Sequence, residues 1–213
     1  MKNYLVLACL VVTSISCSTD DNTIPEPEEN FYALTVGNSW VYEHHRRENI
    51  QSIIFNNTGV IDSVKIVGTE IINDNEFYKY RIRTSGNENN IAFCSPNGER
   101  FEYVRDSIGY LIDEYGKVKF SREDDQEFLL REDSFLNLYT ARGENNEIIS
   151  TTAGDFDCEY MKIYAKQPQT LELFPALDKY HFAEGVGKVF NTVSFSSEDI
   201  HRMERRLISY NVQ

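Results

Sequence analysis

Short runs of alternating apolar and polar residues, separated by turn residues, fill the sequence from residue 39 onward. In the run Glu76–Thr84, aromatic and aliphatic side chains alternate with three basic ones. A period of two places successive side chains on opposite faces of a strand. The pattern therefore predicts antiparallel β-strands that bury one face and expose the other to solvent.

We expect an all-β domain with minor α content, built as one large, curved antiparallel sheet of about 11–13 strands, half-barrel or sandwich-like in form. Gly68 is expected at a bulge and residues 73–75 at a hairpin turn. Asp133–Ala141 and Gln167–Lys179 lack alternation, and we expect a helical turn in the first and a short helix at Leu171–Phe174 in the second. The runs that predict strands are the one starting at residue 39 and Val60–Ile72, Glu76–Thr84, Ile91–Cys94, Arg100–Arg105, Tyr110–Glu114, Lys117–Ser121, Glu127–Arg131, Ile148–Thr152, Glu159–Ala165, Gly187–Phe195 and Glu204–Tyr210.

Composition supports a single folded domain and excludes one class of partner. The 213 residues are 41% hydrophobic and 13% aromatic, which is enough to form a core. The formal net charge is −13, and it becomes −14 when Lys2 is removed with a leader. Such a chain repels phosphate backbones, so nucleic-acid binding is excluded. We interpret the basic cluster within His201–Arg206 as the outward face of a strand.

The N-terminal residues have the pattern of an export leader. Lys2 supplies a positive charge, and Tyr4–Val12 is an uninterrupted apolar stretch. That stretch is about half of the length needed to cross a bilayer, and small polar residues follow it. We therefore expect residues 1–16 to be a signal peptide and the protein to be exported.

Two cleavage hypotheses compete at Cys17. Residues 14–16 suit an ordinary signal peptidase, and they also resemble a bacterial lipobox in which Ser14 replaces the usual leucine. The residues after Cys17, up to Asn30, are polar, acidic and interrupted by prolines, so they predict a flexible, solvated tether. A tether directly after a cysteine favours lipidation of Cys17 and membrane attachment through its acyl chains. The expected organisation is a signal peptide at 1–16, a lipidated tether at 17–30 and a single antiparallel β domain at 31–213.

Residues that could carry chemistry are few. Cys94 and Cys158 can form a disulfide in an exported domain, or they can be two buried thiols. Neither has a Cys or His at metal-ligand spacing. His44 and His45 are adjacent and point to opposite faces of a strand, so we interpret them as part of a strand surface and not as metal ligands. No nucleophile elbow is present. We expect no metal, no cofactor, no catalytic residue and no enzymatic activity.

Four phrases of the sequence resemble those of uncharacterised Bacteroidota lipoproteins. Their pattern is GNxWxY, AGxFxC, an aromatic residue before GVGxV, and a closing strand; the phrases lie at Gly37–Tyr42, Ala153–Cys158, Phe182–Val189 and Arg206–Tyr210. The acidic run after Cys17 also resembles the surface-export signal of such lipoproteins. The resemblance implies an outer-membrane lipoprotein with an antiparallel sheet, and we favour the cell surface over the periplasmic face. It implies no catalytic residues.

Three functions are compatible with these features. The first is a non-catalytic binding or interaction module with a protein, glycan or lipid partner. The second is a carrier of a lipid or another apolar ligand in a half-barrel cavity. The third, a glycan-acting hydrolase, has no residue-level support. Candidate lining residues for an apolar ligand are Tyr78, Tyr80, Phe101, Tyr103, Tyr160 and Tyr164.

Overall fold

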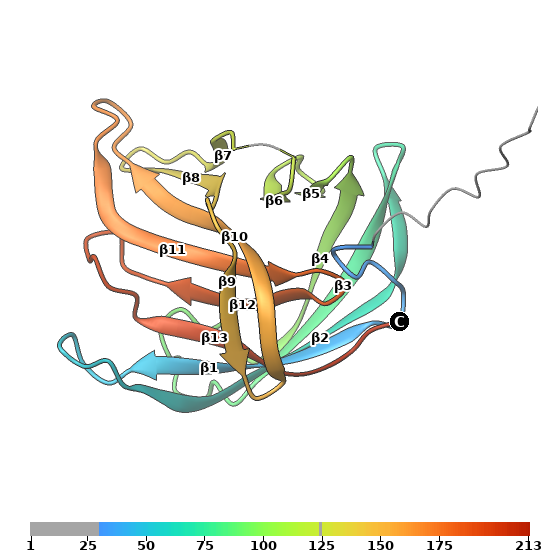
Figure 1. The fold of residues 1–213 in the computed structure, drawn as a ribbon, viewed down its shortest axis with the longest axis horizontal. Helices are drawn as coiled ribbons and strands as arrows, with labels where there is room; N and C mark the ends of the chain where they lie inside the picture. Colours follow the sequence, from blue (N-terminus) through green and yellow to red (C-terminus); the bar gives the residue numbers. More distant parts are fainter. Residues whose placement is uncertain (1–29, 124) are drawn as a thin grey trace, which may run out of the picture.

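The computed structural model describes residues 30–123 and 125–213, and all of its regular elements are strands (Figure 1). The strands are β1 (Ser39–Arg47), β2 (Phe55–Ile72), β3 (Asn75–Ser85), β4 (Gly98–Ser107), β5 (Tyr110–Asp113), β6 (Val118–Ser121), β7 (Phe128–Arg131), β8 (Asn137–Arg142), β9 (Glu147–Thr151), β10 (Gly154–Lys166), β11 (Leu173–Ala183), β12 (Gly187–Val193) and β13 (Met203–Asn211).

The 13 strands of the described chain form one antiparallel sheet. Their order is β6-β5-β4-β3-β2-β1-β13-β12-β11-β10-β8-β7, and β9 pairs with β10 outside this path. The sheet curls until it is nearly a closed barrel, with β6 in contact with β8 and β10 (Figure 1). The expected single, curved antiparallel sheet is confirmed. The first strand, β1, pairs with the last strand, β13, and the other strands follow on either side of this pair, mostly through hairpins. The two ends of the domain therefore meet in the middle of the sheet.

The long β2–β3 hairpin follows the local sequence closely. The pairing register shifts between Ile66 and Gly68, which is the expected bulge. Asn73 and Asp74 form the turn with φ values of 48° and 62°. A turn with two left-handed residues matches the twist of the flanking strands, and Asn and Asp tolerate this conformation better than most side chains.

One end of the barrel is closed by the segment Phe31–Leu34, whose four side chains are all buried. The ring of Phe31 lies 5.6 Å from that of Phe120, which in turn lies 4.5 Å from Phe182. The backbone carbonyl of Phe31 accepts a hydrogen bond of 3.1 Å from Gly185 N. We call Phe31–Leu34 the plug. It joins the core on the inner side of the sheet, so this end of the barrel is filled by the chain itself.

Three local predictions were wrong. Ile91–Cys94 is a turn region, because Phe93 adopts a left-handed φ of 67° and the carboxamide of Asn87 accepts a hydrogen bond from Ile91 N and donates to Ser95 O. Asp133–Ala141 contains β8, which pairs with Met161–Lys166 of β10.

The expected short helix at Leu171–Phe174 is absent, and its last residues begin the 11-residue strand β11. Pro175 concealed this strand, because proline cannot donate to a ladder. The register between β10 and β11 shifts between Tyr164 and Lys166, opposite Pro175, so the ladder is irregular where the donor is missing.

The signal peptide at 1–16, Cys17 and most of the expected tether lie outside the described residues. Within the described ranges, no helix has the length and apolar character needed to cross a membrane.

Candidate functional site

The inner face of the sheet encloses a cavity of about 400 Å³. Its size is within the range of small-molecule sites, roughly 300–1,000 Å³. Much of its wall is apolar or aromatic, from Trp40, Val64, Tyr80, Ile82, Val104 and Phe182. Charged and polar side chains form the rest of the wall, chiefly His44, Asp62, Arg100, Glu102, Lys188 and Arg205.

A row of polar side chains crosses five strands on this inner face. Asp62 on β2 is its centre, with Oδ2 3.0 Å from His44 Nε2 on β1 and 3.0 Å from Arg205 Nε on β13. Thr84 on β3 donates a hydrogen bond of 2.5 Å to Asp62 Oδ1, and Arg100 Nη1 on β4 donates one of 2.9 Å to Thr84 Oγ1. The pleat of neighbouring strands brings these residues to one face.

This row changes two interpretations made from the sequence. His44 does not lie on an exposed strand surface, because it is 6% exposed and faces the cavity. Arg205 does not belong to an outward basic face, because its side chain is 12% exposed and its guanidinium lies 4.0 Å from the centre of the Tyr42 ring. The basic cluster is therefore divided between the two faces of β13.

Asp62 is a buried carboxylate with several partners. Burial by itself would raise its pKa, but the hydrogen bond with His44 and the charge of Arg205 outweigh burial and hold the pKa well below the ordinary range. Asp62 is therefore ionised at neutral pH. Asp62 pairs with Arg205 but does not satisfy its guanidinium group, because Nε and Nη2 of Arg205 are both buried without a hydrogen-bond partner in the described chain.

Lys188 reaches the cavity because of a bulge in β12. His181 pairs with Phe190 and Phe182 pairs with Lys188, so Val189 has no partner across the ladder. A bulge of this kind changes the direction of neighbouring side chains. As a result Lys188 and Asn191, which are three residues apart, both line the cavity.

The ammonium group of Lys188 has little compensation for burial. Its Nζ lies 5.2 Å from the centre of the Tyr180 ring, and it forms no hydrogen bond or ion pair with the residues that the structure describes. Burial first, and then the positive charge of Arg205, lower the pKa of Lys188 from 10.5 to about 7. A lysine in such surroundings is a common feature of functional sites.

The aromatic part of the wall is ordered by hydrogen bonds and stacking. Trp40 stacks on Tyr80 with ring centres 5.9 Å apart, and its Nε1 donates a hydrogen bond of 2.7 Å to Val186 O. The hydroxyl of Tyr42 donates one of 2.7 Å to Lys188 O. Burial raises the pKa values of Tyr42 and Tyr80 well above the usual range. Both rings are therefore neutral and rigidly placed.

The cavity is closed at the plug and reaches solvent elsewhere. Tyr32 of the plug is 3% exposed and lines the closed end. By contrast, the side chain of Glu102 is 59% exposed, although it belongs to the cavity wall. Phe93 is also partly exposed and packs on Phe195, with ring centres 4.6 Å apart. A small molecule therefore has access to the interior without unfolding of the sheet.

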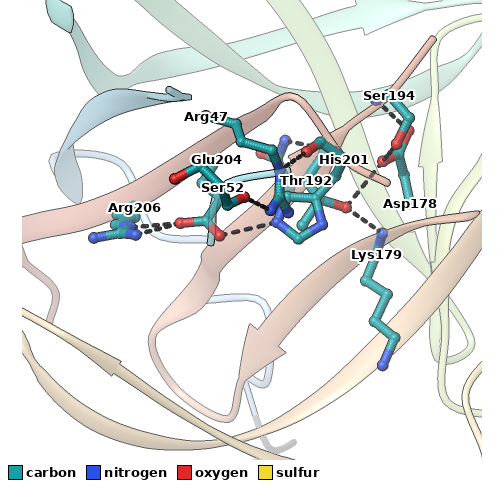
Figure 2. A network of polar contacts seen from close by, with 10 residues as sticks. Arg47, Ser52, Asp178, Lys179, Thr192, Ser194, His201, Glu204 and Arg206 are labelled. Carbon is teal, nitrogen blue, oxygen red and sulfur yellow. Dashed lines mark hydrogen bonds and ion pairs between the residues drawn. The ribbon is translucent and has the colours of Figure 1, made fainter. Parts of the chain in front are cut away.

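A second polar network fixes the strand ends beside the cavity (Figure 2). Glu204 lies 3.0 Å from His201 Nε2 and accepts a hydrogen bond of 2.8 Å from Arg206 Nε. Arg47 donates 2.7 Å and 2.6 Å hydrogen bonds to the carbonyls of His201 and Ser52. The network joins the end of β1 to the start of β13, so it stabilises the frame of the cavity.

Of the six lining candidates chosen from the sequence, the cavity wall contains Tyr80. Tyr78 packs against the core beside it. Glu102 pairs with Tyr80 across the β3–β4 ladder, so Phe101 and Tyr103 face the other side. There they lie under Lys79, whose Nζ is 4.9 Å and 5.4 Å from the two ring centres.

The remaining two candidates also lie away from the cavity. Tyr160 is covered by Lys179, with Nζ 4.3 Å from its ring centre. Tyr164 stacks on Tyr139 at 6.3 Å and donates a hydrogen bond to Glu127. The choice of aromatic residues by type alone could not separate the two faces of β10.

Cys94 and Cys158 are free thiols in the structure, the first half-buried and the second buried. Cys94 is in the turn region before β4, and Cys158 is buried on β10. Burial raises their pKa values to about 11 and about 12, respectively. In the described part of the chain, no group of three or more His, Cys, Asp or Glu side chains is placed to hold a metal ion.

The comparisons with known proteins concern the fold. No protein-family model matches the sequence, and no curated protein matches it. A Bacteroides fragilis protein, described as exported by inference and as having a YmcC-like fold, superposes with a TM-score of 0.55 at 10% identity, over 86% of this chain and 99% of that one. A Parabacteroides distasonis protein, described as a lipoprotein by inference, gives a TM-score of 0.47 at 13% identity, over 87% and 100%. At this identity the first likeness shows a shared fold.

Proposed function

We propose that this chain is an exported, lipid-anchored binding protein that holds a small organic ligand in the cavity of its β-domain and does not catalyse a reaction. The observation that carries the proposal is the cavity itself, which is about 400 Å³ in volume, accessible from solvent and lined by ordered aromatic side chains. Such a wall binds the apolar part of a ligand by removing it from water. An internal cavity favours a small ligand over a protein or glycan partner.

The proposed location is based on the leader and the residues that follow it. An apolar stretch at Tyr4–Val12, then Cys17 and an acidic tether, supports export and attachment to the outer membrane through acyl chains. The acidic run after Cys17 supports the cell surface over the periplasmic face. Within this proposal the domain is displayed by its lipid and acts through its cavity.

The state of Asp62 makes this carboxylate unsuitable as a general acid or base. A carboxylate that acts as a general acid or base needs a pKa near the working pH. Asp62 instead has its pKa held well below the ordinary range by His44 and Arg205, in spite of burial. Its charge therefore organises the cavity wall and is not available for proton transfer.

Trp40 provides a direct test, because it is the single tryptophan of the chain and lies in the cavity wall. Titration of the purified protein with 1-decanol, an uncharged apolar probe, is expected to change the Trp40 fluorescence in a saturable way. Val193→Phe, which places a ring at the cavity wall, is expected to weaken this binding. Val67→Phe is the matched control at an exposed position and is expected to leave binding unchanged. Absence of saturable binding by all apolar probes would contradict the proposal.

The membrane anchor has a separate test. The intact mass of protein extracted from membranes is expected to show a mature chain that begins at an acylated Cys17. Cys17→Ala is expected to abolish acylation. Digestion by protease added to whole cells is expected if the domain is displayed on the surface. An unacylated mature N-terminus would contradict anchoring, and protection of the domain in intact cells would contradict surface display.

A further inference from the structure

The charges that line the cavity do not cancel evenly. Asp62 is in contact with His44, Thr84 and Arg205, and it therefore has no free oxygen for a further cation. Lys188, by contrast, has no anionic partner among the described residues. The uncompensated charge in the wall is thus positive.

Arg205 adds a second donor that points to the same conclusion. Its Nε lies 3.0 Å from Asp62 Oδ2 as an ion pair, but both Nε and Nη2 are buried and have no hydrogen-bond partner in the described chain. A buried guanidinium donor without a partner is costly, because burial removes its water and nothing replaces it. An acceptor brought by a ligand removes that cost. A cation, which has no acceptor, cannot do so.

We infer that the ligand of the cavity is an amphipathic anion, whose carboxylate or phosphate group binds between Lys188 and Arg205 while its apolar body packs against Trp40 and Tyr80. This inference rests on the proposed function and specifies the chemistry of the ligand. Two cationic donors bind such a group by charge-assisted hydrogen bonds, which are stronger than neutral ones. The stacked pair of Trp40 and Tyr80 supplies the apolar surface.

The electrostatics of the cavity agree with this assignment. The pKa of Lys188 is lowered to about 7 by burial and by Arg205, so an incoming anion that stabilises the ammonium form raises it. The other charged groups that act on Lys188 are Glu102 and Arg100 on β4 and Asp62 on β2. The cavity wall also contains titratable groups on other strands, namely His44, Tyr42, Tyr80, Tyr180, Lys119 and Glu204. Binding of an anion is therefore expected to take up a proton at about pH 7–8.

The test compares four amphiphiles with the same ten-carbon chain by titration of Trp40 fluorescence at pH 7. Decanoate and decyl phosphate carry an anion, 1-decanol carries no charge, and decylammonium carries a cation. Decanoate or decyl phosphate is expected to bind about tenfold to a hundredfold more tightly than 1-decanol, which is the range for hydrogen bonds to charged groups. The ratio of the affinities for decanoate and decyl phosphate distinguishes a carboxylate ligand from a phosphate ligand. Decylammonium is expected to bind most weakly.

Three lysine variants separate charge from packing. Lys188→Met is expected to remove most of the preference for the anions over 1-decanol, the rest being supplied by Arg205, and to leave 1-decanol binding intact. Lys188→Arg is expected to retain the preference for anions. Lys65→Met, at an exposed position on β2, is the matched control and is expected to have no effect.

Several results would overturn the inference. Equal binding of decanoate, decyl phosphate and 1-decanol would overturn it and leave the proposed function standing. Tightest binding of decylammonium, or anion binding that Lys188→Met does not weaken, would also overturn it. Failure of all four probes would instead contradict the proposed function itself, so the two failures are distinguishable.

Discussion

Asp62 on β2 and Arg205 on β13 form an ion pair of 3.0 Å across the intervening strand β1. The side chain of Asp62 is 3% exposed and that of Arg205 is 12% exposed, so the pair is almost removed from water. It joins strands from the beginning and the end of the chain at the middle of the sheet. The same carboxylate fixes His44 and Thr84, so three inner side chains depend on one charge.

We predict that Asp62→Asn destabilises the fold strongly. The change leaves Arg205 as a buried cation without its carboxylate partner, and loss of one partner of a buried pair costs about 3–5 kcal/mol. Chemical denaturation at pH 7 measures the change in the free energy of unfolding. Asp155→Asn, at an exposed position, is the control and is expected to change it by less than about 0.5 kcal/mol.

We predict that Asp62 contributes to loss of stability in acid. Its pKa is lower in the folded chain than in the unfolded chain, where it is about 3.9. The stabilisation is therefore complete well above pH 4 and is lost as the pH falls below that value, since the unfolded chain then binds the proton first. Urea denaturation at several pH values between 6 and 3 gives the free energy of unfolding as a function of pH. This free energy is expected to change less steeply with pH for Asp62→Asn than for the unchanged protein. The same pH dependence of the free energy of unfolding in both proteins would contradict this role of Asp62.

We predict that Lys188 destabilises the empty protein. Lys188→Met is expected to raise the free energy of unfolding at pH 6 by about 1–4 kcal/mol, because it replaces a poorly compensated buried charge by an apolar side chain. The pKa of Lys188 is about 7 in the folded chain and 10.5 without the fold. Between these values the unfolded chain holds more protons, so the stability of the unchanged protein rises with pH and the advantage of the variant narrows.

The lowered pKa of Lys188 can be measured directly. After reductive methylation with ¹³C-formaldehyde, one dimethyl-lysine signal is expected to titrate near pH 7 in the NMR spectrum, and Lys188→Met is expected to remove it. Addition of decanoate is expected to move this titration to higher pH. A spectrum in which every lysine titrates near 10 would contradict the buried position of Lys188.

We predict that Gly187→Ala disturbs the closed end of the barrel. Gly187 has a φ of +84°, and an added Cβ would lie 3.1 Å from Tyr32 O and 3.8 Å from Trp40 Cζ2. The left-handed backbone alone costs about 1–3 kcal/mol for another residue. Thermal unfolding and Trp40 fluorescence measure the effect. Gly68→Ala is the control, since no atom lies within 4 Å of its added Cβ, and it is expected to be nearly neutral.

We predict that Cys94 and Cys158 are protected thiols. Their pKa values of about 11 and about 12, raised by burial, leave very little thiolate at pH 8. Iodoacetamide is expected to modify neither residue appreciably in the folded protein and both residues in urea, as measured by intact mass. No modification in urea without a reductant would indicate a disulfide and contradict the structure.

The sequence predicted the sheet well because the strands have one clear period. Gly68 and the turn at residues 73–75 could be placed for the same reason. Strand β11 was missed because Pro175 and an irregular register conceal its alternation. Ile91–Cys94 was misassigned because the side chain of Asn87 holds the backbone there, which no pattern of apolar residues reports.

The candidate site was much less predictable. Of its central residues, Tyr80 followed from alternation, but Asp62 and Lys188 are single charges within β-branched runs. Such a charge is a signal in itself, because it interrupts an apolar stretch at a position that the sheet must bury or expose. Whether such a charge faces the cavity depends on the bulge at Val189 and on the pairing of β13 with β1. The strands β1 and β13 are separated in sequence by most of the chain, so the local pattern does not report their pairing.

The plug lies between the proposed tether and the strands of the barrel. Phe31–Leu34 closes one end of the barrel and is the first buried segment after the tether. In the proposed attachment, a pull through Cys17 would act on these residues before it reached β1. Hydrogen bonds hold these residues in place, among them Tyr32 Oη to Gly109 O at 2.5 Å, Asn38 Nδ2 to Ala33 O at 2.8 Å and Gly185 N to Phe31 O at 3.1 Å. If the domain is held through Cys17 as proposed, the closed end of the cavity is the first part of the described domain on which tension would act.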